Sequence, residues 1–554
     1  MTDRPLAART SGRGSRAVTI FTVAALVAGP PLDYLRYHHY PLLSPEVLLP
    51  GALWLVCAIG IGSLLNRASR PVRILAFKIL LLVFIDWQFS NRVDLPYRLL
   101  VVAVLVTVWL LERRMETIVA VATAAFYLAS LPSSSPIRAS RLDFAEVRGD
   151  TSLPAVLYLI LDEHIGVEGW PEELAGTREM QQRVRQFYLG EGFRLFGKAY
   201  SEYAETDASI PAVLNWPIEE PYRDVAEVVP GESYALKANA FFEKLSAKGY
   251  RIRVYQSTYL DYCDERGVAI RSCDTWPANS IRNLSLDPMP LWDKARLVGL
   301  YFLQHNSHVY VRLRDVLLRL VVRQNPSVTG QLPWWSARIY KSVFPGAMQL
   351  LAHLQNDLRA DDPRGTLYFA HLLSPHHPYE VDAACRSQTR PTFWLDLPAT
   401  NTPAERAWRY GLYAGQTECL YRHLTALFQM IDSIPALRHM VVIVHGDHGS
   451  RIALHYPLKR LLASMQPSDF TDGFSAQFAI RAPGIPAGYD RQFAPINELV
   501  GRALASGFTR IDVPETGRHF VKLDSGFDVP FLMVRLSDTS LALPTGGAAA
   551  AARH

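Results

Sequence analysis

Five apolar blocks fill most of the first 132 residues and constrain this chain more than any other feature of its sequence. They cover residues 18–35, 47–65, 72–87, 97–111 and 115–132. Each block approaches the roughly 20 apolar residues that a helix needs to cross a bilayer. We therefore predict a membrane domain of about five transmembrane helices over residues 1–132.

Arginines mark three of the links around these blocks. They precede the first block, separate the second from the third, and separate the fourth from the fifth: Arg4, Arg9, Arg13, Arg16, Arg67, Arg70, Arg73, Arg113 and Arg114. Because basic links stay in the cytoplasm, five spans deliver everything after Leu131 to the other side. The first block could instead be a cleaved signal peptide, which leaves four spans and the same side for the large domain. Both alternatives predict a multi-pass bacterial inner-membrane protein with a periplasmic domain.

The cysteines fit an oxidising compartment. Four of them follow the apolar blocks: Cys263, Cys273, Cys385 and Cys419. The short separation in "YCDERGVAIRSC" predicts a disulfide between Cys263 and Cys273, with free buried thiols as the alternative. The net charge of +5 is spread thinly along the chain, so we expect no nucleic-acid partner.

After the membrane domain, the sequence changes character. A Ser- and Pro-rich stretch predicts a linker over residues 133–150, followed by a catalytic domain over 151–540 and a disordered, low-complexity tail over 541–554. Apolar runs predict strands at 155–162, 251–257, 366–373, 439–449 and 475–484, and helical patterns occur at 235–250 and 408–434. This alternation predicts an α/β fold, with a mostly parallel sheet flanked by helices.

One segment departs from this scheme. Residues 291–324 are rich in apolar side chains interleaved with arginine. We expect a helix packed on the catalytic domain. The alternative is an amphipathic element that lies on the outer face of the membrane.

Polar side chains gather where three of the predicted strands end, which is where sites form in such sheets. They are Asp162, Glu163 and His164; His371, His376, His377 and Tyr379; and His445, Asp447, His448 and Arg451. Carboxylate and imidazole in "GDHG" (446–449) suit Zn²⁺ or Mn²⁺. We predict a divalent metal, Zn²⁺ or else Mn²⁺, held by Asp162, Asp447 and His448. Glu163 is a minor alternative ligand, and a purely structural turn or a helix cap would also explain these residues.

Thr206 lies in "TDASIP", just before a helix that we expect to start near Ser209. A metal ion lowers the pKa of a bound hydroxyl and makes it a nucleophile. Backbone N–H groups at a helix start also favour a phosphoryl group. We therefore predict Thr206 as both catalytic nucleophile and metal ligand, with simple N-capping as the alternative.

The His-rich loop is predicted to bind substrate. His376, His377 and Tyr379 lie between or beside prolines in an irregular segment, and His371 is either part of the same pocket or a core histidine. These imidazoles could stabilise charge, protonate a leaving group, or complete a second metal site. Arg451 and His455 are further candidates for substrate binding, and His445 is a weaker one.

These motifs occur in an order that resembles the alkaline phosphatase/sulfatase superfamily. They are an apolar strand ending at Asp162, "T-x-x-S-x-P" at 206–211, "PHHPY" at 375–379 and "GDHG" at 446–449. With the membrane spans, the chain looks most like membrane-bound phosphoethanolamine transferases that modify lipid A, and next like lipoteichoic acid synthases. The resemblance covers roughly residues 151–485. It implies an alkaline-phosphatase-like fold, a metal bound by Asp162, Thr206, Asp447 and His448, and ping-pong transfer through a phospho-threonine.

Two departures limit the resemblance. The C/S-x-P-x-R stretch of sulfatases is absent, which argues against sulfate ester hydrolysis. The transferases usually have Glu as first ligand where this strand ends in Asp162, and Asp is common there in the hydrolases of the superfamily.

We expect a transferase that moves phosphoethanolamine or phosphoglycerol from a membrane phospholipid donor to a lipid-linked or envelope glycan acceptor. A hydrolase of phosphate esters or diesters would keep the same ligands and use water. A non-catalytic scaffold in envelope assembly is the third alternative, but such a protein would be expected to have lost Thr206 or the Asp–His pair.

Overall fold

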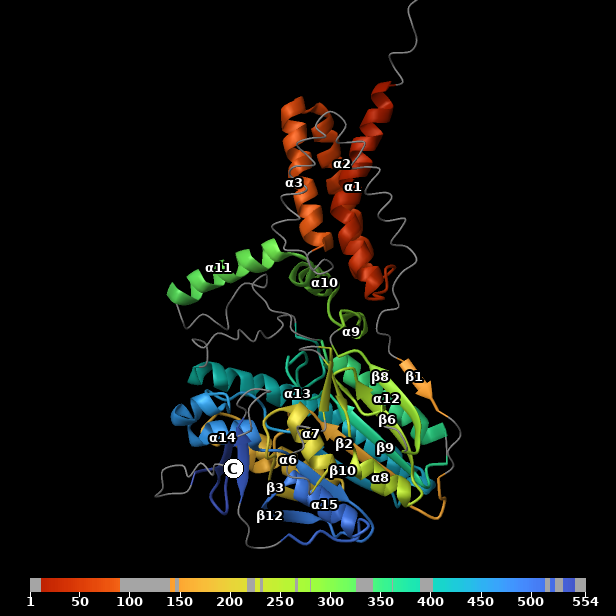
Figure 1. The fold of residues 1–554 in the computed structure, drawn as a ribbon, viewed down its shortest axis with the longest axis vertical. Coiled ribbons are helices and arrows are strands. Elements are labelled where there is room, and N and C mark those ends of the chain that lie inside the picture. Colours follow the sequence, from red (N-terminus) through yellow and green to blue (C-terminus); the bar gives the residue numbers. More distant parts are fainter. Residues whose placement is uncertain are drawn as a thin grey trace, which may run out of the picture. The chain divides into compact units, whose positions relative to one another are not determined.

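The computed structural model describes residues 11–89, 140–144, 149–216, 225–229, 233–264, 268–278, 280–324, 342–360, 362–388, 402–513, 519–523 and 532–543 (Figure 1). The chain divides into two compact units, and each is described by itself. The first unit comprises Met1–Ile137 and Ser280–Tyr340, and the second comprises Arg138–Asn279 and Lys341–His554.

The apolar blocks of the first unit form helices. The first three predicted spans lie in α1 (Ser11–Tyr37), α2 (Pro45–Arg67) and α3 (Arg70–Phe89). Within the described residues, two helical stretches, Ala17–Tyr37 and Pro45–Arg67, are long and apolar enough to cross a membrane. α3 differs from these two helices because it contains the charged residues Arg73, Lys78 and Asp86, which make it less suited to cross a membrane.

The remaining predicted spans, 97–111 and 115–132, lie outside the described residues, as do the tail from residue 544 and much of the predicted linker. The number of spans and the domain boundaries therefore stay predictions.

The segment 291–324 belongs to the first unit. It forms α10 (Leu291–Asn306) and α11 (His308–Gln324), preceded by α9 (Arg282–Leu286). α10 contacts α1, α2 and α3. Its Phe302 packs against Tyr34 of α1 and Trp87 of α3, and its Lys294 pairs with Glu46 of α2. The structure therefore groups this segment with the apolar helices of the first unit, whereas the sequence analysis placed it with the catalytic domain.

A mixed sheet of nine strands, counted over the described residues, forms the second unit. Its order is β1 (Ser140–Asp143), β8 (Ile270–Trp276), β6 (Arg251–Ser257), β9 (Thr366–Leu372), β2 (Val156–Leu161), β10 (Val441–Gly446), β11 (Phe478–Arg481), β3 (Arg194–Tyr200) and β12 (Gly488–Pro495). The strands from β8 to β10 run parallel, whereas β1 and β11 pair antiparallel with their neighbours. The prediction of an α/β fold with a mostly parallel sheet is confirmed.

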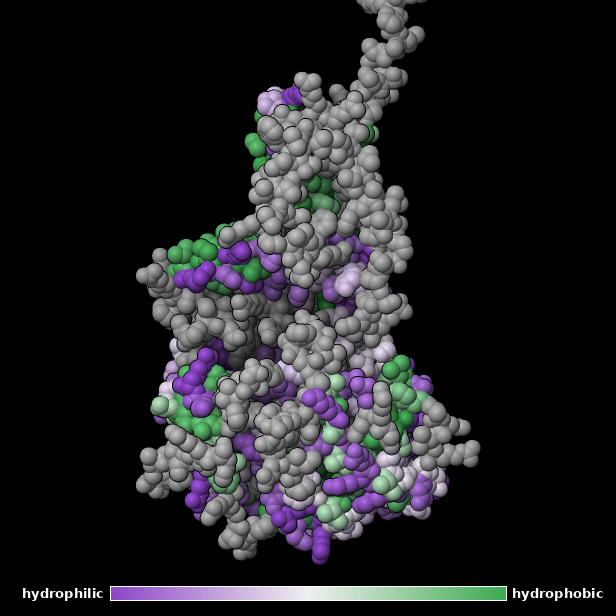
Figure 2. Space-filling model, viewed as in Figure 1, coloured by the Kyte–Doolittle hydropathy of each residue, from purple (hydrophilic) through white to green (hydrophobic). Residues whose placement is uncertain are grey.

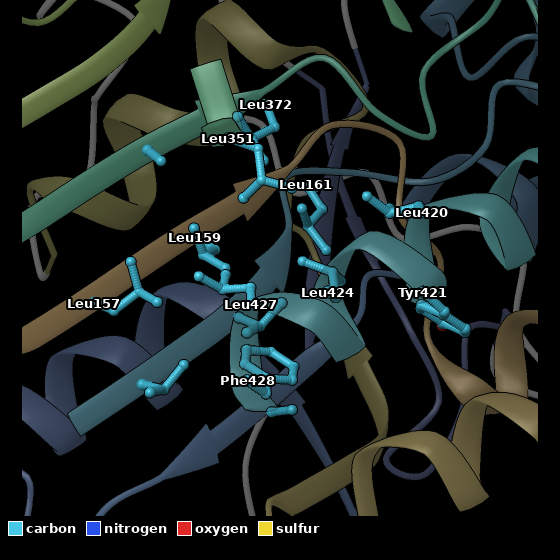
Figure 3. Close-up of a cluster of buried hydrophobic side chains, with 14 of the residues drawn as sticks. Leu157, Leu159, Leu161, Leu351, Leu372, Leu420, Tyr421, Leu424, Leu427 and Phe428 are labelled. Carbon is cyan, nitrogen blue, oxygen red and sulfur yellow. The ribbon is translucent and has the colours of Figure 1, made fainter. Parts of the chain in front are cut away.

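Helices cover both faces of this sheet because its central strands are apolar on both sides. One face packs against α6 (Thr177–Gly190), α12 (Phe344–Ala360) and α13 (Pro403–Ser433). The other face packs against α7 (Thr206–Leu214), α8 (Ala240–Ala247) and α15 (Ile496–Ala505). Figure 3 shows the first of these cores, where the leucines of β2 meet Leu424, Leu427 and Phe428 of α13.

The other elements are smaller. They are η2 (Val167–Gly169), β4 (Val225–Val229), β5 (Ser233–Leu236), β7 (Leu260–Asp261), η7 (Pro435–Leu437), η8 (Lys459–Ser464), α14 (Pro467–Phe474), β13 (Phe520–Leu523) and β14 (Leu532–Arg535). The helix predicted at 235–250 is shorter than expected, because its first residues belong to β5. α13 begins at Pro403, before the predicted residue 408. The side chain of Thr402 caps it, and a proline suits its first position.

Candidate active site

The site forms where three neighbouring parallel strands end. Leu161 of β2 pairs with Leu372 of β9 and with Gly446 of β10, so these strands finish side by side. Asp162 and Asp447 follow β2 and β10 directly. With His371 of β9, they place one possible ligand atom each within 4.8 Å of one another, and all three side chains are buried. The predicted meeting of strand ends therefore does bring these residues together.

The glycines of "GDHG" have a steric role in this arrangement. A Cβ at Gly446 would lie 2.1 Å from the carbonyl oxygen of His164, and one at Gly449 would lie 2.1 Å from that of Asp472. Any side chain at either position would force the backbone apart. The two glycines thus let the turn carrying Asp447 and His448 lie directly against neighbouring chain segments.

His448 contacts both carboxylates. Its Nε2 lies 3.3 Å from Oδ2 of Asp447 and 3.9 Å from Oδ1 of Asp162. Its Nδ1 lies 2.8 Å from the carbonyl oxygen of Gly449, and because a carbonyl can only accept, the proton is on Nδ1. Nε2 therefore presents a lone pair to the site, as a metal ligand requires.

Thr206, the first residue of α7, also lies at this group. Its Oγ1 lies 3.2 Å from Nε2 of His448, and the side chain is 1% exposed. The N-cap of α7 is Glu205, so Thr206 is the first helical residue, and capping does not account for its hydroxyl. The helix begins three residues before the expected Ser209, whose own hydroxyl instead donates to the carbonyl oxygen of Asp447.

The buried carboxylates leave room for a cation. Oδ1 of Asp162 and Oδ2 of Asp447 are buried and have no hydrogen-bond partner in the described part of the chain. An unpaired charged oxygen in the interior is costly. Burial would raise the pKa of Asp447, but the neighbouring His448 and His371, together with hydrogen bonds from the N–H of Glu163 and the hydroxyl of Thr206, lower it. Two carboxylates and two imidazoles therefore fit a divalent ion such as Zn²⁺ or Mn²⁺.

Glu163 has a different set of partners from Asp162. Its Oε1 lies 2.9 Å from Nδ1 of His377 and 3.5 Å from Nε2 of His376, while its Oε2 accepts the backbone N–H of His377. Its own N–H donates to Oδ1 of Asp447 at a positive φ of 61°, a strained conformation for a glutamate. Glu163 thus holds the His-rich loop beside the group formed by Asp162 and Asp447. Because its carboxylate is engaged by this loop, Asp162 is favoured over Glu163 as the ligand.

Arg451 is the positive group of the site. Its guanidinium contacts Nε2 of His448 at 3.1 Å, Oε2 of Glu205 at 2.6 Å and Oε1 of Glu163 at 3.6 Å. Burial alone would lower the pKa of Arg451, but the negative groups around it raise the pKa well above its ordinary value. Glu205, which the sequence did not single out, also accepts a hydrogen bond from Tyr456.

The predicted substrate residues separate into two sets. His371, His376, His377 and Arg451 lie at the site. His455 pairs with Asp469 instead, through contacts from its Nδ1 and its backbone N–H. Tyr379 is fully buried in the core against Tyr413. These contacts thus give no support to a substrate role for His455 or Tyr379.

His445 and His164 are core histidines. His445 contacts the hydroxyl of Tyr158 through Nε2, and His164 contacts that of Tyr421. Burial lowers the pKa of each imidazole to about 4. Both are therefore neutral at pH 7.

One face of α13 holds three of the loops in place. Tyr410 donates to Asp472 next to the "GDHG" loop, and Tyr413 donates to the carbonyl oxygen of Glu163 at 2.8 Å. One turn later, Nε2 of the fully buried Gln416 donates to the carbonyl oxygens of the His-rich loop, and its Oε1 accepts the N–H of Glu380. Sequence reasoning missed these residues, although their spacing of three places them on one helical face.

Two disulfides border the site. The predicted Cys263–Cys273 bond is confirmed, and the adjacent Tyr262 places its hydroxyl 3.0 Å from Nδ1 of His371. A second disulfide, Cys385–Cys419, joins the end of the His-rich loop to α13. Both bonds fit an extracytoplasmic location for this unit.

No protein-family model matches the sequence, and no curated protein matches it. Solved structures that align with the chain include the C-terminal periplasmic domain of EcEptC from Escherichia coli in complex with Zn, at 13% identity and a TM-score of 0.39, covering 74% of this chain and 98% of that one. The phosphonate monoester hydrolase of Agrobacterium radiobacter aligns at 13% identity with a TM-score of 0.41 (69% and 85% covered). A 2-O GAG sulfatase aligns at 14% with a TM-score of 0.39 (69% and 80% covered). At such scores, the alignments add no argument to the geometry above.

Proposed function

We propose that this chain is a metal-dependent enzyme of the alkaline phosphatase/sulfatase superfamily that transfers a phospho-head group through a covalent phospho-Thr206. The observation that carries the proposal is the hydroxyl of Thr206, buried 3.2 Å from Nε2 of His448 at the start of α7. This hydroxyl is not needed as a cap. It lies beside Asp162 and Asp447, each of which has one buried oxygen without a hydrogen bond in the described part of the chain, and such oxygens favour a bound cation.

The ion would be held by Asp162, Asp447, His448 and Thr206, with His371 next to them. A bound Zn²⁺ or Mn²⁺ supplies a Lewis acid that lowers the pKa of a coordinated hydroxyl near neutral pH. The first N–H groups of α7 and the guanidinium of Arg451 are suited to the oxygens of a phosphoryl group.

The transfer has two balanced halves. In the first, Oγ1 of Thr206 forms a bond to phosphorus, the bond from phosphorus to the glycerol oxygen of the lipid breaks, and diacylglycerol leaves with the proton that Thr206 gives up. In the second, an acceptor hydroxyl attacks phosphorus, the phosphorus–Thr206 bond breaks, and a proton returns to Oγ1. His376 and His377, beside Glu163, are suited to carry these protons.

The two apolar helices and the two disulfides support the choice of donor and compartment. α1 and α2 are apolar enough to hold the chain in a bilayer, where a phospholipid donor is found. The disulfides support a periplasmic catalytic domain on a bacterial inner membrane. The donor head group is phosphoethanolamine or phosphoglycerol, and the acceptor is an envelope glycan or glycolipid.

The test uses the full chain in vesicles of phosphatidylethanolamine and phosphatidylglycerol, with Zn²⁺ or Mn²⁺ and with or without a glycolipid acceptor. We expect diacylglycerol release and a head group on the acceptor. Free phosphoethanolamine or phosphoglycerol, formed equally with and without acceptor, would identify a hydrolase. Intact phospholipids with metal-loaded protein would contradict the transferase and leave a hydrolase with another substrate.

A further inference from the structure

The helix α11 lies at one end of the helices α1–α3, because α10 packs across that end. Nζ of Lys294 in α10 lies 3.9 Å from Oε1 of Glu46 at the start of α2. Phe302 of α10 packs against Tyr34 near the end of α1 and against Trp87 near the end of α3. The three helices alternate in direction, so these contacts all belong to the same end of the first unit.

The start of α11 is fixed to this end by Asp86 of α3. The carboxylate of Asp86 is buried and accepts hydrogen bonds from the hydroxyl of Ser307 and the backbone N–H of Val309. The hydroxyl of Ser307 in turn accepts the N–H of Tyr310. A carboxylate that caps the first turn of α11 therefore ties this helix to the end of α3.

One face of α11 exposes a stripe of large apolar side chains. The residues of the stripe are between 37% and 58% exposed: Val309, Leu313, Val316, Leu317 and Leu320. Their spacing places them on one side of the helix. Leu318 and Arg314 point the other way and are buried, while the exposed Arg312 and Arg319 border the stripe. Figure 2 shows hydrophobic (green) and hydrophilic (purple) surface side by side along α11.

The composition of this face fits lipid better than water or protein. Soluble surfaces rarely carry so continuous an apolar stripe. Arginines beside it can keep their stems among acyl chains and their guanidinium groups at lipid phosphates. The same unit also exposes large apolar side chains on α2, among them Leu53 and Val56, as a surface that faces lipid would.

The arginines of the sequence identify which side of the membrane this end faces. Arg67, Arg70 and Arg73 lie at the turn between α2 and α3, and Arg13 and Arg16 lie near the start of α1. These positions are at the end of the helices opposite to α10. Because basic links stay in the cytoplasm, the end with α10 and α11 faces outward.

We propose that α11 lies in the outer interface of the bilayer, with its apolar stripe among the acyl chains and with Arg312 and Arg319 at the phosphates of anionic lipids. This inference goes beyond the proposed catalysis, since it uses none of the residues of the active site.

The experiment places single spin labels on the full chain in vesicles of phosphatidylcholine and phosphatidylglycerol. The described residues contain one free cysteine, Cys57, which is replaced in a Cys57→Ser background that keeps both disulfides. Labels are attached at Leu313→Cys and Leu320→Cys. Val56→Cys on α2 is the lipid control, and the exposed Arg422→Cys on α13 is the water control. Collisions with oxygen and with a water-soluble nickel complex are then measured.

We expect the labels at 313 and 320 to match the one at 56, with several-fold more oxygen collisions and fewer nickel collisions than the label at 422. Nickel accessibility equal to that at 422 would overturn the proposal. Immobilised labels shielded from both reagents would also overturn it, because a protein partner or a second copy of the chain would then cover the stripe.

Discussion

The hydroxyl of Thr206 and the imidazole of His448 lie 3.2 Å apart, although 242 residues separate them in the chain. Two local features hold them there. Gly449 accepts from Nδ1 of His448, which turns Nε2 toward the hydroxyl. Ser209 ties the first turn of α7 to the backbone of Asp447. Thr206 and the turn that carries Asp447 and His448 are thus connected through contacts of side chains with backbone carbonyls, which a substitution in either segment would disturb.

The first prediction concerns the metal. In Asp162→Asn or Asp447→Asn protein, we expect well below one equivalent of bound Zn²⁺ or Mn²⁺ after dialysis, because each change removes a charged ligand. Elemental analysis of the purified full chain measures the metal. Glu163→Gln is the matched control, since Glu163 contacts His377 and Arg451 instead. A Glu163→Gln protein that loses its metal while Asp162→Asn keeps it would reverse the assignment of the ligand.

The second prediction concerns Gln416. Gln416→Leu leaves carbonyl groups of the His-rich loop without their donor, which costs about 1–3 kcal/mol of stability. If the loop shifts, activity should fall about 10- to 100-fold, with metal content unchanged. Glu418→Gln, two residues further along α13, is the control and should keep full activity. Equal activity of both variants would show that the loop does not need this anchor.

The third prediction concerns the disulfide between Cys385 and Cys419, which closes a segment with a sequence separation of 34. Replacing both cysteines by serine should destabilise the catalytic unit by about 3–4 kcal/mol on the chain-entropy estimate. Melting temperatures of the full chain in detergent, compared with those of a Cys57→Ser protein, measure the effect. An unchanged melting temperature would argue against the bond.

The fourth prediction follows from His164 and His445. In the folded chain, burial lowers the pKa of each imidazole to about 4. The unfolded chain binds these protons near pH 6.5, so the stabilisation is complete above that pH and is lost as pH falls toward 4. Each imidazole contributes up to about 3 kcal/mol to this loss.

Melting temperatures between pH 7.5 and 5 measure the effect. His445→Gln should flatten the pH dependence, whereas the exposed His439→Gln should not. The same slope in both variants would exclude His445 as its origin.

The sheet was largely predictable because its central strands are apolar on both faces and end in polar residues. The strand predicted at 251–257 coincides with β6, and the strand at 366–373 differs from β9 by one residue. Local signals failed where two patterns adjoin, as at 235–250, where a short strand precedes the helix. The grouping of 291–324 with the apolar helices also depended on long-range packing that periodicity does not report.

The site was predictable in part for a related reason. Strand order brought Asp162, His371 and Asp447 together, and strand ends are visible in the sequence. Which side chains of a loop face inward is not visible, since long-range contacts decide it. Tyr379 packs into the core, and His455 turns to Asp469. Gln416 and Tyr413 lie within a long helix, where a glutamine resembles an ordinary surface residue and a tyrosine an ordinary core residue. Only their contacts with distant loops distinguish them.

The covalent role of Thr206 is the central claim, and mass spectrometry of its peptide tests it most directly. The full chain, loaded with metal, is incubated with phosphatidylethanolamine and phosphatidylglycerol without acceptor, and a Thr206→Ala protein serves as the blank. We predict a phosphoethanolamine or phosphoglycerol adduct on Thr206, whose mass identifies the transferred group. An unmodified Thr206 in metal-loaded protein that still releases diacylglycerol would contradict the claim.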